Sequence, residues 1–136
     1  MKLQLNTQET LNLFTGYGND YVEINKNRHS GGLIVSSNDV RPWPAASFAD
    51  LNDTHFALIA AMNPELVLIG TGQRIQFPHP KLYRALTDRQ IGVDIMDVSA
   101  LCRTFNVLVS EGRQVVAGIV FRHHQRSAGA GFDGRR

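Results

Sequence analysis

The sequence of 136 residues predicts a single α/β domain in which helices pack on the faces of a parallel or mixed sheet. Two observations lead to this fold class. After residue 50, stretches typical of helices and of strands alternate in the order helix, strand, helix, strand, helix, strand. Before residue 50, short runs separated by glycine and asparagine predict two or three antiparallel strands that extend or cap that sheet. We expect residues 1–121 to form the domain.

The first strands are indicated by alternation. In residues 21–25, Val22 and Ile24 alternate with more polar neighbours, as on a strand with one buried face. A short extended stretch precedes them and is closed by turn-forming residues at 16–20. A polar connection follows residue 25, and residues 33–36 form the next expected strand.

Two prolines surround the single tryptophan. Pro42 and Pro44 exclude a helix interior and a central strand at this point, because proline lacks the amide donor that both require. We expect Trp43 to fill the edge of the core, and the alternative is that its ring stacks on a ligand.

The second part of the chain supplies the expected helices. Asn52, Asp53 or Thr54 can cap a helix that runs to about Met62, before a stop at residues 63–64. The helix predicted at residues 99–111 has the clearest amphipathic pattern, with Asp97 or Ser99 as its cap and Gly112 as its terminator. The remaining expected elements are a strand at 66–69, a helix at 80–90, a strand at 91–97 and a strand at 114–121.

The positive net charge of +2 comes from the end of the chain. Residues 122–136 contain four arginines and one aspartate, so the first 121 residues carry a net charge of −1. These last residues are rich in glycine and poor in apolar side chains, and we expect a disordered basic tail. Because the body has no basic patch with interleaved aromatic residues, we expect no nucleic-acid partner.

Several other classes of protein are not expected. No apolar run approaches the roughly 20 residues that span a bilayer, so we expect no integral membrane segment, and the N-terminus lacks a secretory pattern. A cytoplasmic location is therefore expected. Cys102 is the lone cysteine, and no His or Cys cluster has the spacing of a metal site. No catalytic set of residues and no cofactor motif is evident, which favours a protein that is not an enzyme.

A glycine loop after an apolar strand is the clearest candidate site. Gly70 and Gly72 follow the strand expected at 66–69, but residues 73–80 are extended and contain two prolines instead of opening a helix, so a dinucleotide fingerprint is not met. The loop still lies at the carboxyl end of a strand, where α/β sheets place their clefts. An anionic group could be held between this loop and the helix at 99–111. The candidate ligand-binding residues are Gly70, Thr71, Gly72, Arg74, Arg103 and Asn106.

Both parts of this candidate site have a structural alternative. The glycines can serve only to let the backbone turn close to a neighbouring helix. The polar face of the helix can be an ordinary solvated surface. Cys102, at the border of the apolar stripe, has no local histidine and reads more simply as a small hydrophobic residue than as a nucleophile.

The string "NPELVLIGTG" is followed later in the chain by "GVDIMDVSALCRTFNVLVSEGRQVVAGIVF". This order of motifs resembles a family of domains of unknown function that includes the mitochondrial respiratory complex I assembly factor 3, and the resemblance covers roughly residues 10–121. Asp97 and Phe105 stand where the family often has threonine and tyrosine. The motif residues are Pro64-Glu65, Gly70-Thr71-Gly72, Ala100, Thr104-Phe105-Asn106 and Glu111-Gly112-Arg113.

The resemblance implies a mixed sheet with helices on its faces and an added small antiparallel β layer, a three-layer arrangement. It implies no known reaction. The mitochondrial member acts through protein contacts, so our first hypothesis is a protein-interaction or assembly-factor-like module with an unknown partner linked to membrane-complex biogenesis. The alternative is a small anionic-ligand binder or unrecognised enzyme with its cleft at the glycine loop, and nucleic-acid binding through the tail ranks last.

Overall fold

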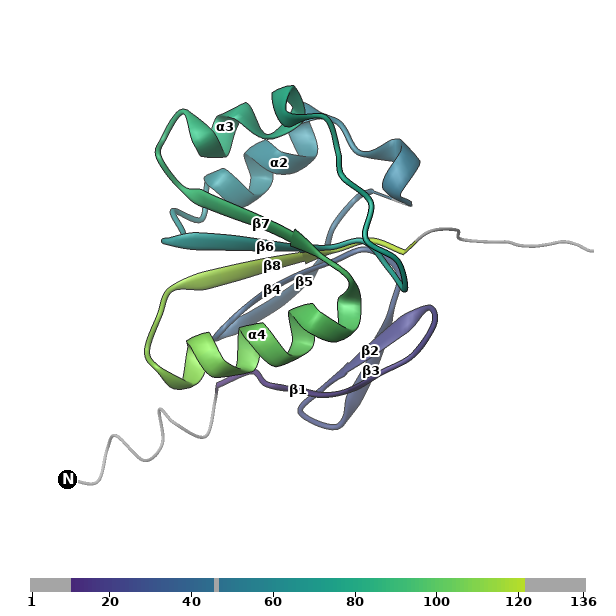
Figure 1. Cartoon of the computed structure of the whole chain (residues 1–136). Helices are drawn as coiled ribbons and strands as arrows, with labels where there is room; N and C mark the ends of the chain where they lie inside the picture. The colour runs from purple at the N-terminus through teal and green to yellow at the C-terminus, as the bar shows by residue number, and fades with distance from the viewer. Residues whose placement is uncertain (1–10, 46, 122–136) are drawn as a thin grey trace, which may run out of the picture.

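The computed structural model describes residues 11–45 and 47–121, and the predicted disordered tail at 122–136 lies outside this range. Figure 1 shows three layers: a central sheet, with α2 and α3 on one side and α4 together with a small sheet on the other. The strands are β1 Phe14–Tyr17, β2 Tyr21–Ile24, β3 Asn27–Ser30, β4 Leu33–Ser36, β5 Asp39–Pro42, β6 Leu66–Gly70, β7 Gly92–Met96 and β8 Val115–Ile119. The helices are η1 Phe48–Asp50, α2 Asp53–Ala60, η2 Pro80–Tyr83, α3 Arg84–Thr87 and α4 Val98–Ser110.

The central sheet is mixed, in the order β5-β4-β8-β6-β7. β6 pairs parallel with both β7 and β8, whereas β4 pairs antiparallel with β8 and β5. β6 and β8 are covered on both faces, which explains their continuous apolar sequences. The fold class expected from the sequence, a mixed sheet flanked by helices with a small N-terminal antiparallel layer, is confirmed.

Two buried clusters lie on opposite faces of the central sheet. One joins α4 and the small sheet to the central strands through residues such as Phe14, Leu68 and Phe105. The other packs α2 and α3 on the opposite face and contains Trp43 and Phe56. Phe14 and Phe105 meet edge to face, with ring centroids 5.1 Å apart, and so fasten the small sheet to α4.

Trp43 fills the core edge as the sequence predicts. Its side chain is 2% exposed, and its Nε1 donates a hydrogen bond of 2.9 Å to the carbonyl of His55. A Cβ at Gly118 would lie 3.0 Å from both the Trp43 ring and the Ile59 side chain. Gly118 therefore lets this large ring lie directly against β8.

The prediction of two or three strands before residue 50 is wrong in number, because the structure has five there. β3 was expected to be a polar connection; its residues are mostly exposed, and backbone pairing with β2 holds it in place. β5 ends in Pro42, which is tolerated because β5 is an edge strand. The helix expected at 80–90 is also shorter, with a 3-10 turn followed by one α-helical turn that ends at Thr87.

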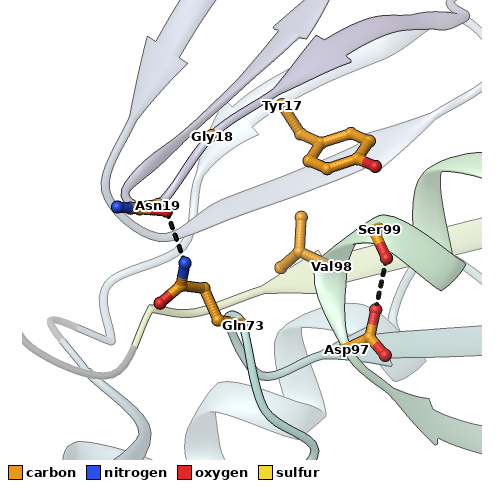
Figure 2. Close-up of a pocket in the computed structure, with 8 residues that line it drawn as sticks. Tyr17, Gly18, Asn19, Gln73, Asp97, Val98 and Ser99 are labelled. Atoms are coloured by element: carbon orange, nitrogen blue, oxygen red, sulfur yellow. Dashed lines mark hydrogen bonds between the residues drawn. The ribbon is translucent and has the colours of Figure 1, made fainter.

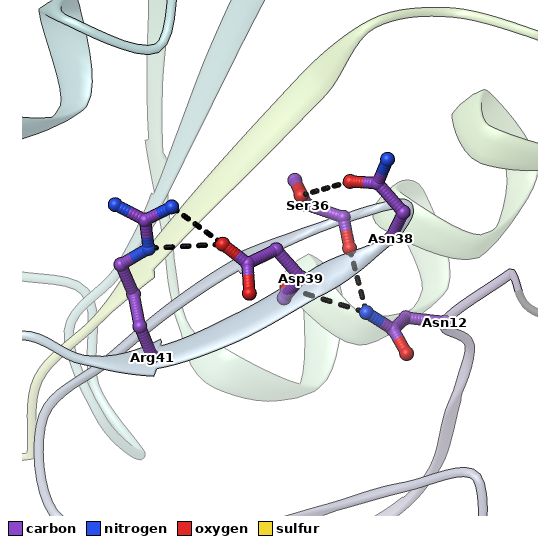
Figure 3. A network of polar contacts seen from close by, with 5 residues as sticks. All are labelled: Asn12, Ser36, Asn38, Asp39 and Arg41. Carbon is purple, nitrogen blue, oxygen red and sulfur yellow. Dashed lines mark hydrogen bonds and ion pairs between the residues drawn. The ribbon is translucent and has the colours of Figure 1, made fainter.

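The β4–β5 hairpin is tied to the chain just before β1 by a polar network (Figure 3). The side-chain amide of Asn12 donates to the carbonyls of Ser36, at 2.9 Å, and Asp39, at 3.2 Å. Arg41 pairs with Asp39 on the exposed side of the same hairpin. The Asn12 bonds therefore connect the chain just before the small sheet to the β4–β5 hairpin at the edge of the central sheet.

Candidate functional site

A pocket of about 390 Å³ lies where the turn between β1 and β2 approaches the exit of β6 and the start of α4. Figure 2 shows the Tyr17 ring on one side of this pocket, Asn19 and Gln73 on another, and the first residues of α4 nearby. The lining residues are Tyr17, Gly18, Asn19, Gly72, Gln73, Asp97, Val98 and Ser99. We call this feature the inter-sheet pocket.

Two glycines shape its walls. Gly72 has a φ of +95°, and its carbonyl accepts a hydrogen bond of 2.8 Å from the Val98 amide, so the loop turns directly against the helix start. A Cβ at Gly18 would lie 2.2 Å from the ring of Tyr21. The side-chain amide of Gln73 donates to the side-chain carbonyl of Asn19 and bridges the two sides of the pocket.

Asp97 caps α4 at the pocket wall. Its Oδ1 accepts hydrogen bonds from the Ala100 amide, at 2.9 Å, and from the Ser99 hydroxyl, at 2.8 Å. These bonds, first that of the Ala100 amide and then that of Ser99, lower the pKa of the Asp97 carboxyl below its ordinary value. Of the two caps that the sequence offers, Asp97 and Ser99, the structure uses Asp97, and this residue also brings a negative charge to the pocket.

Thr71 shapes the segment that leaves the pocket. Its side chain is fully buried, and its hydroxyl donates to the Arg74 carbonyl while accepting from the Gln76 amide, both at 2.9 Å. This hydroxyl thus acts as a brace inside a turn. Beyond it, Ile75 is 46% and Phe77 is 70% exposed, which makes Phe77 the most exposed large apolar side chain among the described residues.

The six residues predicted to bind a ligand occupy different environments. Gly72 lines the inter-sheet pocket, whereas Gly70 is buried against Leu101 and Val98. Arg74 and Arg103 are exposed and do not line the pocket. Binding of an anion by these six residues stays a prediction, and the pocket is built mainly from residues that the sequence did not single out for it.

Asn106 holds the small sheet against α4. Its side-chain carbonyl accepts a hydrogen bond from the Phe14 amide, and its side-chain amide donates to the Phe14 carbonyl, both at 2.8 Å. These two hydrogen bonds are of the kind that a neighbouring strand would make with the backbone of β1. Because both polar groups of the side chain are engaged, the contact gives Asn106 a structural role.

Cys102 is buried, and Glu65 and Arg113 form an ion pair, so these motif residues have structural explanations. Burial raises the pKa of the Cys102 thiol to about 12, so the thiolate that a nucleophile needs is disfavoured. Glu65 accepts from the Arg113 guanidinium, at 2.8 Å, and from the Gln114 amide, at 3.1 Å, which joins the start of β6 to the turn before β8. Within the described residues, no group of three His, Cys, Asp or Glu side chains could hold a metal ion.

The protein is thus a small α/β domain with a mixed sheet, an added antiparallel layer and a pocket where the two sheets meet. The chain belongs to the protein family of unknown function DUF498/DUF598, whose model matches residues 14–120. The family resemblance drawn from the sequence is thereby confirmed.

Known proteins of this kind are similar over most of the described domain. The bovine (Bos taurus) NADH dehydrogenase [ubiquinone] 1 alpha subcomplex assembly factor 3 is 33% identical over 99 residues, which are 71% of this chain and 54% of the bovine protein. The chain thus spans about half the length of this curated relative. A crystal structure of a Bordetella parapertussis protein is 35% identical, with a TM-score of 0.76, and the match covers 82% of this chain and 96% of that one. An NMR structure of a Xanthomonas campestris protein is 29% identical, with a TM-score of 0.77, and the match covers 93% and 100% of the two chains.

The sequence predicts no integral membrane segment, and the lengths and composition of the helices bear on this prediction. Among the described residues, no helix has the length and apolar character needed to cross a bilayer.

Proposed function

We propose that this protein is an assembly-factor-like module that binds other proteins during the biogenesis of a membrane complex. The observation that carries the proposal is the 33% identity with the bovine assembly factor over 99 residues, 71% of this chain. We assign it no catalytic residue and no cofactor. A cytoplasmic location belongs to the same proposal, since a lone unpaired cysteine suits a reducing compartment.

An exposed apolar segment supports a role in protein binding. Ile75 and Phe77 project from the connection between β6 and η2, next to the turn braced by Thr71. Aromatic side chains are enriched in the cores of protein interfaces. Because the Thr71 brace already orders the start of this segment, binding through it would lose less conformational entropy than binding through a flexible loop.

The proposal can be tested by site-specific photo-crosslinking in the cells that make the protein. A photoreactive phenylalanine analogue placed at Phe77 should give a discrete adduct with a subunit of a membrane complex or with a partner engaged in its assembly. The matched control is the same analogue at Leu58, which is 45% exposed on α2.

The two positions separate specific contact from general exposure. The expected result is an adduct from position 77 that is absent from position 58. Equal adducts at both positions, or none at position 77, would count against the proposed protein-binding role.

A further inference from the structure

We propose that the inter-sheet pocket accepts the guanidinium group of an arginine side chain from a protein partner, with the Asp97 carboxylate as its ion partner. This inference rests on the proposed function and states the chemistry by which the partner is recognised. It follows from the charge of the pocket, from the use of its amide groups and from the character of its remaining walls.

The charge of the pocket is negative. Of its lining residues, Asp97 is the one with a charged side chain. Among the described residues, the ion pairs are Arg41–Asp39 and Arg113–Glu65, so no cation lies within ion-pair distance of the half-buried Asp97 there. The charge of Arg103, exposed on the same helix, is the smallest of the influences that lower the pKa of Asp97. Both of its short hydrogen bonds end on Oδ1, which leaves Oδ2 without a side-chain donor among those residues. A cation in the pocket would supply that donor.

Three of the first four amides of α4, those of Val98, Ala100 and Leu101, already donate hydrogen bonds within the protein. The Val98 amide donates to the Gly72 carbonyl at 2.8 Å, and the Leu101 amide donates to the Asp97 carbonyl at 3.0 Å. The Ala100 amide binds the Asp97 carboxylate, which also neutralises the positive end of the helix dipole. A helix N-terminus usually attracts phosphate, but here the Asp97 carboxylate already occupies that position. An anion that entered the pocket would therefore be repelled by the negative charge of Asp97.

The other walls suit a planar cation. Tyr17 is 50% exposed and presents an aromatic ring at the pocket, and a guanidinium group stacks favourably on such rings. The same small sheet already contains such a pair, since the Arg28 guanidinium lies 3.8 Å from the centre of the Tyr21 ring. The Gln73 amide group and the Ser99 hydroxyl add acceptors for the several N–H donors of arginine.

The size of the pocket also suits one side chain with its neighbouring backbone. Its volume of about 390 Å³ falls at the lower end of the range found for small-ligand sites, about 300–1,000 Å³. A single arginine captured here gives weak binding by itself, so the contact would act together with the apolar segment around Phe77.

The test uses the full chain and two model compounds of matched shape. N-acetyl-arginine amide carries the guanidinium cation, and N-acetyl-citrulline amide replaces it with an uncharged urea group. Each is titrated against the ¹⁵N-labelled protein, and amide shifts are followed by NMR. We expect saturable shifts at Gly18, Asn19, Gln73 and Ser99 with the arginine compound at millimolar concentration, and binding of the citrulline compound about tenfold weaker.

Two variants make the result specific. Asp97→Asn keeps a good helix cap but removes the charge, so it should weaken binding of the arginine compound about tenfold and leave that of the citrulline compound unchanged. Tyr17→Leu, at a half-exposed position, removes the ring and should weaken the arginine compound several-fold. Equal binding of both compounds, unchanged binding in Asp97→Asn, shifts confined to other surfaces, or no saturable shift would each overturn the assignment.

The outcome can be separated from that of the proposed function. An adduct at position 77 without arginine binding would remove the pocket assignment and leave the interaction role in place. Charge-dependent arginine binding without any adduct would keep the site and count against the proposed role in assembly.

Discussion

The side-chain amide of Asn106 serves as the hydrogen-bonding partner of a strand residue. It satisfies both backbone groups of Phe14, at 2.8 Å each, from a helix that begins far along the chain. The neighbouring Phe105 packs against the Phe14 ring, so two adjacent helix residues secure the polar and the apolar side of β1. At the residue scale, Phe105 and Asn106 of the Thr104-Phe105-Asn106 motif hold the small sheet against α4.

Asn106→Ala should destabilise the protein by about 2 kcal/mol, because it leaves two part-buried backbone groups of Phe14 without a partner. The melting temperature should fall by roughly 5–10 °C. Val107→Ala, at an exposed neighbouring position, is the control and should change stability by less than about 0.5 kcal/mol. Thermal unfolding followed by circular dichroism measures both, and equal stability of the two variants would contradict the docking role.

At the scale of elements, α4 couples the sheets and forms part of the pocket. It begins at Val98 under the Asp97 cap and ends before Gly112, whose φ of +79° lets the chain leave the helix. Its apolar side packs into the same cluster as the small sheet, and its first residues line the inter-sheet pocket. A single element thus carries both the docking contacts and the candidate binding charge.

Asp97→Ala should cost about 1 kcal/mol at neutral pH through loss of the cap. Because folding lowers the pKa of Asp97 below 3.8, the contribution of its charge is present above that value and is lost as the pH falls through the folded-state pKa. The difference in unfolding free energy between wild type and variant should therefore shrink below about pH 4. Urea unfolding at pH 7 and pH 3 measures it.

The control for this experiment is Asp97→Asn, which should keep most of the cap at both pH values. A wild-type advantage over Asp97→Ala that stays constant with pH would show that the carboxylate charge contributes nothing to the helix.

At the scale of the whole molecule, β8, the last strand among the described residues, lies in the middle of the central sheet. β8 pairs with β4 from the first part of the chain and with β6 from the second. The contacts continue past its end, since the Val120 amide donates to the Gly70 carbonyl at 2.9 Å and Phe121 is 5% exposed. The two parts of the sheet therefore join only when the C-terminal strand is in place.

Truncation tests the domain boundary predicted at residue 121. A chain ending at Phe121 keeps every described contact and should melt within about 2 °C of the full chain. A chain ending at Ile119 loses the Val120–Gly70 bond and the buried Phe121 ring, which should cost more than about 2 kcal/mol. Scanning calorimetry compares the three chains. A large loss of stability on removal of residues 122–136 alone would place the boundary later.

Parts of the fold were readable from local sequence patterns. The helix near residues 52–62, the strand at 66–69, the long helix and the closing strand were expected because burial on one or both faces imposes a period on the side chains. β3 and β5 were missed because they are held by backbone pairing at sheet edges, where exposed polar residues carry no such period.

The sequence by itself determined the α/β class, the family and the presence of a long amphipathic helix with Asp97 or Ser99 as its cap. Only the tertiary structure decided that the glycine loop meets Tyr17 and Asn19 at one pocket, and that Asn106 faces the backbone of Phe14. The physical reason is distance along the chain. Helix and strand periods report the burial of neighbouring residues, whereas the pocket joins three segments that only the packing of the two sheets around α4 brings together.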